Sequence, residues 1–272
     1  MKIARVFPRK TNATPTDDLA FYGPPGLFVP EVDEVHISVT FTYDLDYARE
    51  LQWQWGAVHD NVKLGGPATG QRGEQFEPGM YIKPGYVITS RGCPNNCWFC
   101  SVPKRDGNIR ELEIKEGYNL LDDNLLACSD AHIKAVFAML KKQPGRTFTG
   151  GLEALRLKEW HVKALKELKP VACFFAYDTP DDYEPLKKAS ELLLDYKFTN
   201  HQMKCYVLCG FPKDTMKEAE GRMWQCIDLG FYPKAMLWRN KQGHKDSIWG
   251  RFQRKWNLPA IIYSEIKKRK LA

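Results

Sequence analysis

Three cysteines stand within eight residues, at positions 93, 97 and 100, directly after the β-prone run 86–89. Cysteine thiolates at such short spacing bind metals, in zinc sites or in iron–sulfur clusters. A saturated four-iron cluster takes one protein thiolate per iron. Because this segment lacks a fourth cysteine, the spacing Cys-x3-Cys-x2-Cys predicts a [4Fe-4S] cluster bound by Cys93, Cys97 and Cys100, with one iron left open for a small molecule.

A structural zinc site is the main alternative for these thiols. Such a site normally needs four protein ligands, often as two paired Cys-x2-Cys or His-x3-His units. The nearest further candidates are Cys128 and His132, and no second pair follows the loop. An ordinary electron-transfer cluster is the other metal alternative.

The residues around the thiols favour a tight loop. Gly92, Pro94 and the pair Asn95-Asn96 are typical of short backbone reversals. The loop resembles that of the radical S-adenosylmethionine superfamily, whose signature is Cys-x3-Cys-x-aromatic-Cys, with Phe99 at the aromatic position. The resemblance implies S-adenosyl-L-methionine on the open iron and an electron donor such as flavodoxin or ferredoxin. In that family one electron cleaves a carbon–sulfur bond, giving methionine and a 5′-deoxyadenosyl radical that abstracts hydrogen from a substrate. The substrate stays unidentified.

The bulk composition fits a globular protein. With 272 residues, 43% of them hydrophobic, the chain is long enough to bury a full core. No run approaches the ~18 apolar residues of a membrane span, and the start lacks an apolar signal core. Eight cysteines without a secretory signal favour a reducing compartment. We therefore expect a soluble, cytoplasmic protein without a membrane partner.

The net charge is moderately positive, at +7, and part of it lies in the terminal run 267–270. Short basic ends are more often solvated than bound to nucleic acid, so a nucleic-acid partner is an open alternative that we do not favour. The competing function is a non-catalytic iron–sulfur or zinc protein that docks nucleic acid through this tail and through Trp249, Phe252 and Trp256. Those aromatics, at helical spacing, are also explained by a C-terminal helix that folds back on the core.

Short β-prone runs alternate with helix-period segments from residue 85 onward, which predicts an α/β fold of repeated βα units. The expected strands cover 86–89, 118–121, 147–149, 172–176, 204–208 and 234–237. With six such units, the resemblance implies a partial (βα)6 TIM-like barrel over 85–240, with its chemistry at the carboxyl ends of the strands. Residues 241–272 are expected to form a helical, basic tail.

The first 84 residues predict a small Rossmann-like βαβ lobe, with strands at 34–39 and 61–64 around a helix at 45–55. A strand running into Gly-Gly-Pro is similar to the end of the cobalamin-binding domain in one radical branch. The Asp-x-His-x-x-Gly motif of that domain is absent, and neither His36 nor His59 stands in it. We expect a vestigial lobe that does not carry cobalamin.

Two segments are candidates for binding the ammonium group of S-adenosylmethionine. At the end of the third expected strand, Thr149, Gly150, Gly151 and Glu153 resemble the superfamily's glycine-rich motif, although a simple tight turn also explains the glycines. At the end of the second, the Asp-Asp-Asn run 122–124 looks like that of the cobalamin-associated and methylthiotransferase-like branches. Asp122 or Asp123 would then bind the ammonium group, or cap the next element.

Further candidates follow the later strands. Gly210, in a segment similar to the Gly-Phe-Pro-Gly-Glu-Thr of the methylthiotransferase-like branch, would let adenine lie against the fifth strand, while Asp214 or Thr215 caps the following helix. After the fourth strand, Tyr177 and Asp178 are the candidate catalytic residues, because a phenol and an acid there could donate hydrogen or bind substrate.

The remaining cysteines do not predict a second cluster. Cys205 and Cys209 share a strand face, but at ~3.3 Å per residue they lie about 13 Å apart, too far for one small cluster. Cys128, Cys173 and Cys226 are scattered singly, and buried thiols pack as small apolar groups.

Overall fold

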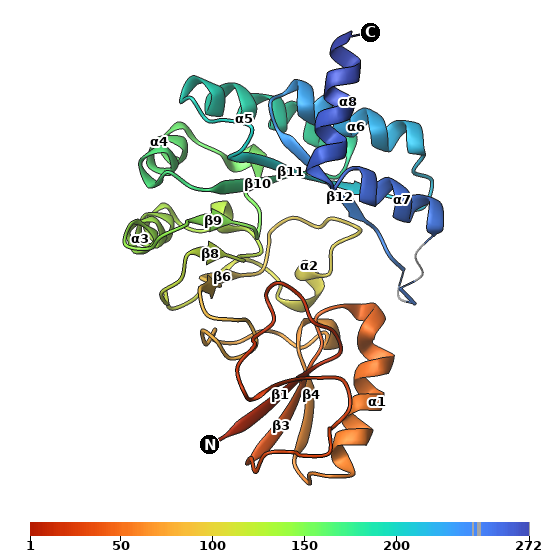
Figure 1. The fold of residues 1–272 in the computed structure, drawn as a ribbon. Coiled ribbons are helices and arrows are strands. Elements are labelled where there is room, and N and C mark those ends of the chain that lie inside the picture. The colour runs from red at the N-terminus through yellow and green to blue at the C-terminus, as the bar shows by residue number, and fades with distance from the viewer. Residues whose placement is uncertain (241, 244–245, 272) are drawn as a thin grey trace.

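The computed structural model describes residues 1–240, 242–243 and 246–271, and only the backbone at 270 and 271. Residues 241, 244, 245 and 272, which belong to the expected C-terminal segment, lie outside this description. Two parallel sheets dominate the molecule, a small one near the N-terminus and a larger one that carries most of the helices (Figure 1). Each sheet has its own cluster of buried apolar side chains.

The large sheet has six parallel strands in the order β12-β11-β10-β9-β8-β5. Each strand therefore pairs with the strand of this sheet that follows it in the chain, which is what repeated βα units produce. The strands are β5 (Tyr86–Val87), β8 (Asn119–Leu120), β9 (Thr147–Phe148), β10 (Ala172–Tyr177), β11 (Met203–Cys209) and β12 (Tyr232–Leu237). The α/β class and the six expected strands are confirmed.

Helices follow the strands and cover one side of this sheet (Figure 1). Their apolar stripes point inward, as Ile133, Val136 and Leu140 of the first helix do. The helices are α3 (Asp130–Lys141), α4 (Glu159–Leu168), α5 (Tyr183–Asp195) and α6 (Met216–Asp228). Single 3₁₀ turns lie at Thr42–Asp44, Pro67–Thr69, Leu125–Ala127, Ala154–Arg156 and Pro180–Asp182. The alternate side chains of the strands lie on the opposite face of the sheet.

The small sheet has four parallel strands in the order β2-β1-β3-β4. They are β1 (Ile3–Phe7), β2 (Ala20–Tyr22), β3 (Glu34–Ser38) and β4 (Val62–Gly65), and α1 (Leu45–Gly56) joins the last two. The expected βαβ unit is therefore present, but the expectation omitted β1 and β2. Arg5, in the middle of β1, interrupts the apolar pattern in the sequence. The strand tolerates this charge because Arg5 is buried in an ion pair with Asp17.

Both histidines of this lobe have local partners. His59 Nε2 lies 3.0 Å from the Val32 carbonyl oxygen, and its Nδ1 accepts a hydrogen bond from the Asn61 amide. His36 lies 2.6 Å from a Glu34 oxygen and 2.5 Å from the Tyr81 hydroxyl. These contacts give the two side chains structural roles.

The C-terminal helices α7 (Ser247–Lys255) and α8 (Pro259–Leu271) pack on the large sheet. Trp256 is fully buried and meets Trp224 of α6 edge to face, and Phe252 is buried beside it. This burial favours the folded-back helix over a base-stacking platform. In the basic tail, Arg269 pairs with Asp228 and Lys268 with Glu265. The division of the chain at residues 84 and 240 stays a prediction.

A short hairpin lies between the two sheets. It consists of β6 (Ser90–Arg91) and β7 (Arg110–Glu111), with α2 (Val102–Arg105) in the connection. This connection contains the three closely spaced cysteines. Among the described residues, none of the helices combines the length and apolar character that a membrane span needs.

Candidate functional site

The cysteine loop leaves the large sheet at the carboxyl end of β5 and is held at its base. The Cys93 amide donates to the Gly107 carbonyl at 3.0 Å, and the Cys100 amide donates to the Cys97 carbonyl at 3.1 Å. Gly92 has a φ of 88°, and a Cβ there would lie 2.3 Å from the Asn108 carbonyl oxygen. Only glycine fits this turn. Cys97 is exposed, and Cys93 and Cys100 are half-buried.

The three thiols influence one another electrostatically. Burial raises the pKa values of Cys97 and Cys100, and the charges of the neighbouring loop thiols raise them further. Among the described residues, however, no group of three or more His, Cys, Asp or Glu side chains is placed to hold a metal ion.

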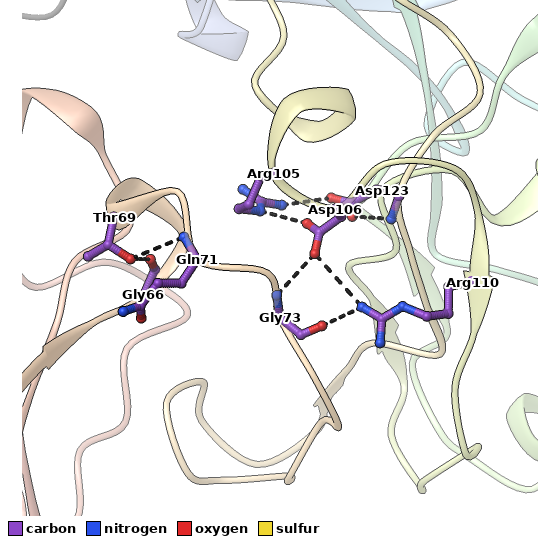
Figure 2. Close-up of polar contacts among 9 residues, drawn as sticks. Gly66, Thr69, Gln71, Gly73, Arg105, Asp106, Arg110 and Asp123 are labelled. Atoms are coloured by element: carbon purple, nitrogen blue, oxygen red, sulfur yellow. Dashed lines mark hydrogen bonds and ion pairs between the residues drawn. The ribbon is translucent and has the colours of Figure 1, made fainter.

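A buried charge network supports the loop from below. The Asp106 carboxylate accepts hydrogen bonds from the Gly73 amide at 3.1 Å and from Arg105 Nε at 2.6 Å. Arg105 also lies 3.5 Å from Asp123, whose other oxygen accepts from the Gly92 amide at 2.9 Å. Figure 2 shows Asp106 between Arg105 and Gly73, with Asp123 beyond. The linker from the small lobe is thus tied to the residue before Cys93.

Arg110 closes the network on its other side. Its guanidinium donates to the Gly73 carbonyl and lies 4.0 Å from Asp106 (Figure 2). Sequence reasoning assigned no role to Arg105, Asp106 or Arg110. Nothing in their local pattern identifies partners that lie some 30 residues away in the chain, such as Gly73.

Asp122 and Asp123 hold the loop and the strand before it. Asp122 is buried, and its carboxylate accepts from the Thr89 amide and hydroxyl, both at 2.6 Å, and from the Ser90 hydroxyl at 2.8 Å. Burial raises the pKa values of both aspartates. The oxygens of both aspartates already have protein partners.

Asn124 links Glu153 to the loop thiol of Cys93. The Asn124 amide nitrogen donates to a Glu153 oxygen at 2.6 Å and lies 3.3 Å from the Cys93 sulfur. Glu153 also accepts from Arg156 at 2.6 Å. The Asn124 Oδ1 is buried without a hydrogen-bond partner among the described residues. A buried acceptor left open beside the Cys93 thiol marks a place where a donor is missing.

The glycine pair after β9 divides into two roles. Gly150 is required by the fold, because a Cβ there would lie 2.3 Å from the Asp122 carbonyl oxygen. Gly151 has a φ of 101° and open space around its Cα. The Thr149 hydroxyl donates to Asn119 at 2.6 Å. Of the two glycines, Gly151 has open space where a side chain would lie, and Glu153 is half-buried nearby in the sequence.

Tyr177 and Asp178 do not lie together. The Tyr177 hydroxyl donates to Gln225 of α6 at 2.7 Å, on the helix-covered side of the sheet, and burial raises its pKa to about 12. Asp178 accepts from the Leu208 amide at 3.2 Å, and burial raises its pKa to about 7. Its charge also raises the pKa of Cys97, so Asp178 is the member near the loop.

The segment after β11 meets the loop through aromatic rings. Trp98 contacts Phe99 and Phe211 edge to face, with ring centroids 5.4 and 5.7 Å apart. Gly210 has a packing reason of its own, since a Cβ there would lie 2.6 Å from Leu237 and 3.0 Å from Trp249.

The helix after this segment begins as expected. Thr215 caps α6, where its hydroxyl accepts from the Glu218 amide at 3.2 Å. The alternative cap, Asp214, instead accepts from the Gly210 amide at 2.8 Å and pairs with Arg222.

The sheet face opposite the helices carries aromatic and basic side chains that sequence reasoning missed. Phe174 stacks on Tyr206 with centroids 4.6 Å apart. Lys204 Nζ lies 4.3 Å from the Tyr232 ring centroid, and Lys234 Nζ lies 5.9 Å from that of Phe174. Burial and then the charge of Lys234 lower the pKa of Lys204. The alternation of side chains between the two faces of β10 to β12 is the sequence signal that could have predicted this face.

The other five cysteines differ from the loop thiols in being buried. Burial raises the pKa values of Cys128 and Cys209 to about 12. They belong to the apolar cluster of the large sheet.

The sequence matches no protein-family model and no curated protein. The site therefore has to be interpreted from its own residues.

Proposed function

We propose that the chain is a radical S-adenosylmethionine enzyme. The observation that carries the proposal is the loop of three thiols, one exposed and two half-buried, that follows a parallel strand, with the unpartnered Asn124 Oδ1 and the Glu153 carboxylate near Cys93. The finer fold assignment, a partial (βα)6 barrel, belongs to this proposal. It is supported by the sequential order of the six parallel strands.

The residues present fit a [4Fe-4S] cluster better than a single ion. A cluster binds each thiolate at a different iron, so its ligands need not meet at one point. Cys93, Cys97 and Cys100 would hold it, and Gly92 at the base of the loop permits the tight turn that brings Cys93 out of the strand. When bound, the cluster and S-adenosylmethionine supply a 5′-deoxyadenosyl radical for hydrogen abstraction, with electrons from a donor such as flavodoxin or ferredoxin.

The chain's own residues bind and orient the cosubstrate. Glu153 and the open Asn124 oxygen are the acceptors for its ammonium group, and Gly151 leaves room for the approach. Asp122 and Asp123 fix the strand and the loop from behind. This division replaces the open choice between the carboxylates with one acceptor, Glu153.

The substrate side is the sheet face opposite the helices. Phe174, Tyr206 and Tyr232 offer aromatic surface there, and Lys204 and Lys234 offer positive charge. Asp178, close to Cys97, takes up or holds a proton near neutral pH. Tyr177 is not carried into the proposal, because its hydroxyl faces α6.

Anaerobic reconstitution with iron and sulfide tests the proposal. We expect a brown protein that forms 5′-deoxyadenosine when S-adenosylmethionine and a reductant are added. Cys97→Ala should lose both properties, while the buried Cys226→Ala is the matched control and should keep them. A protein that takes up zinc but no iron under these conditions would contradict the proposal, as would 5′-deoxyadenosine formation that survives in Cys97→Ala.

A further inference from the structure

A cavity of about 630 Å³ lies between the small lobe and the cluster loop. Ser38 and Gly65, at the carboxyl ends of β3 and β4, form one wall, and Arg91 and Arg105 beside the loop form another. In open parallel sheets, ligands bind outside the carboxyl ends of the strands. The volume lies within the range of small-molecule sites. None of these residues has a part in the proposed cluster or cosubstrate site.

The cavity carries positive charge that the protein leaves unpaired. The Arg91 Nε is buried and has no hydrogen-bond partner within the described part of the chain, and Asp123 is close enough for the Arg91 charge to lower its pKa but forms no ion pair with it. Arg72, exposed on the linker, has no ion pair with any described residue either. By contrast, Lys63 is paired with Glu34 and Arg105 with Asp106. Glu74 also lines the cavity, from the exposed linker. Unpaired guanidinium groups bind phosphate in preference to neutral groups.

The cavity also offers a fixed aromatic surface. The Tyr81 ring stacks on His36 with centroids 6.1 Å apart, and its hydroxyl lies 2.5 Å from His36 Nδ1. His36 is held in turn by Glu34 at 2.6 Å. Tyr81 is nevertheless 41% exposed. A rigid, accessible ring of this kind can stack against a nucleic base.

The backbone of the small sheet allows close approach. A Cβ at Gly65 would meet only the Gln71 side chain, at 3.5 Å. Gly66 differs, because its φ of 106° and its contact with the Val39 backbone already require glycine. Gly65 is therefore the position where a ligand can lie against the strand end.

We propose that this cavity binds a nucleoside phosphate, with its base against Tyr81 and its phosphate on Arg91 and Arg72. Binding also affects the cluster loop. Arg91 stands two residues before Cys93, and its guanidinium packs on Gly73, whose amide donates to Asp106 (Figure 2). A ligand on Arg91 therefore stabilises the base of the loop through the Asp106 network. This inference does not rest on the proposed radical chemistry.

Calorimetric titration of the full-length, iron-free protein with the common ribonucleoside 5′-monophosphates tests the proposal. We expect saturable binding of at least one nucleotide, and weaker binding of its nucleoside and of inorganic phosphate by about tenfold or more. Arg91→Met keeps the aliphatic stem and should weaken nucleotide binding by a similar factor. The matched control, Arg49→Met on the exposed face of α1, should bind as the wild type does.

Further variants keep the test decisive if Arg91→Met fails to fold. Thr40→Trp fills the cavity from an exposed position and should abolish binding, and Arg72→Gln should weaken it. Glu153→Gln, in the cosubstrate site, should leave nucleotide affinity unchanged. The proposal is overturned by no saturable nucleotide binding, by equal affinity for nucleoside and nucleotide, by binding that survives Thr40→Trp, or by binding that Glu153→Gln removes.

Discussion

The cysteine loop and the large sheet with its helices use the cysteine side chain in opposite ways. Cys173 and Cys205 of the sheet and Cys226 of α6 are fully buried among apolar side chains, where burial alone raises the pKa of Cys173. In the loop, Cys97 is exposed, and Cys93 and Cys100 are half-buried. Packing explains the first set without any chemistry. It does not explain the second set, because an exposed thiol contributes no free energy of burial.

Replacing a loop cysteine should have the largest effect on this comparison. Cys93→Ala, Cys97→Ala or Cys100→Ala should remove iron binding completely, because each thiolate binds a separate iron. Iron analysis and the visible spectrum after anaerobic reconstitution measure the loss. Cys173→Ala should retain iron while losing about 1–3 kcal/mol of stability through the cavity it leaves. Equal iron content in Cys97→Ala and Cys173→Ala would remove the distinction between the two sets.

The support beneath the loop should give the next largest effect. Asp122→Asn replaces an acceptor of three hydrogen bonds with a side chain that offers one oxygen, leaving buried donors of Thr89 and Ser90 unpaired. We expect a loss of about 1–3 kcal/mol in the free energy of unfolding, measured by urea titration of the iron-free protein. Asp195→Asn, exposed at the end of α5, is the control and should change it by less than about 0.5 kcal/mol. An unchanged midpoint in Asp122→Asn would mean that the loop does not depend on this carboxylate.

The choice between carboxylates can be sharpened by cosubstrate affinity. Glu153→Gln should weaken S-adenosylmethionine binding by about tenfold, since a charge-assisted bond to an ammonium group contributes about 1.5–3 kcal/mol. Iron content should not change. Lys268→Gln, paired with Glu265 on the far helix α8, is the control and should bind normally. Unchanged affinity in Glu153→Gln would refute the placement of the ammonium group even if the cluster is present.

Periodicity was sufficient to predict the six strands of the large sheet, because local alternation is written in consecutive residues. It failed for β1, where Arg5 is buried against Asp17 and interrupts the apolar run. It also could not assign Asp122, Asp123 and Asn124. Asp122 binds Thr89 and Asn124 binds Cys93, and each of these partners lies more than 30 residues away in the chain. Asp123 lies near Arg105, which is closer in the chain but still outside any local pattern. Tyr177 was chosen by position at a strand end, whereas the strand's alternation turns its ring toward α6.

The last expected effect is a change of stability with pH, and it concerns Asp178, the carboxyl group near Cys97. Burial and the charge of Asp182 raise its pKa from 3.8 to about 7. The folded protein therefore keeps this proton over a pH range in which the unfolded chain has released it. Stability from this group is complete below about pH 4 and is lost as the pH rises to about 7, with a slope of at most about 1.4 kcal/mol per pH unit.

Asp178→Asn keeps the oxygen that accepts from the Leu208 amide but cannot ionise. Urea unfolding of the iron-free wild type and of this variant should therefore give a stability difference that changes between about pH 4 and pH 7 and is constant above it. The matched variant Asp181→Asn, at the neighbouring helical turn, should follow the wild type. A pH-independent difference for Asp178→Asn would mean that this carboxyl group is ionised in the folded protein. An ionised Asp178 would add its negative charge to that of Glu153 near the loop thiols.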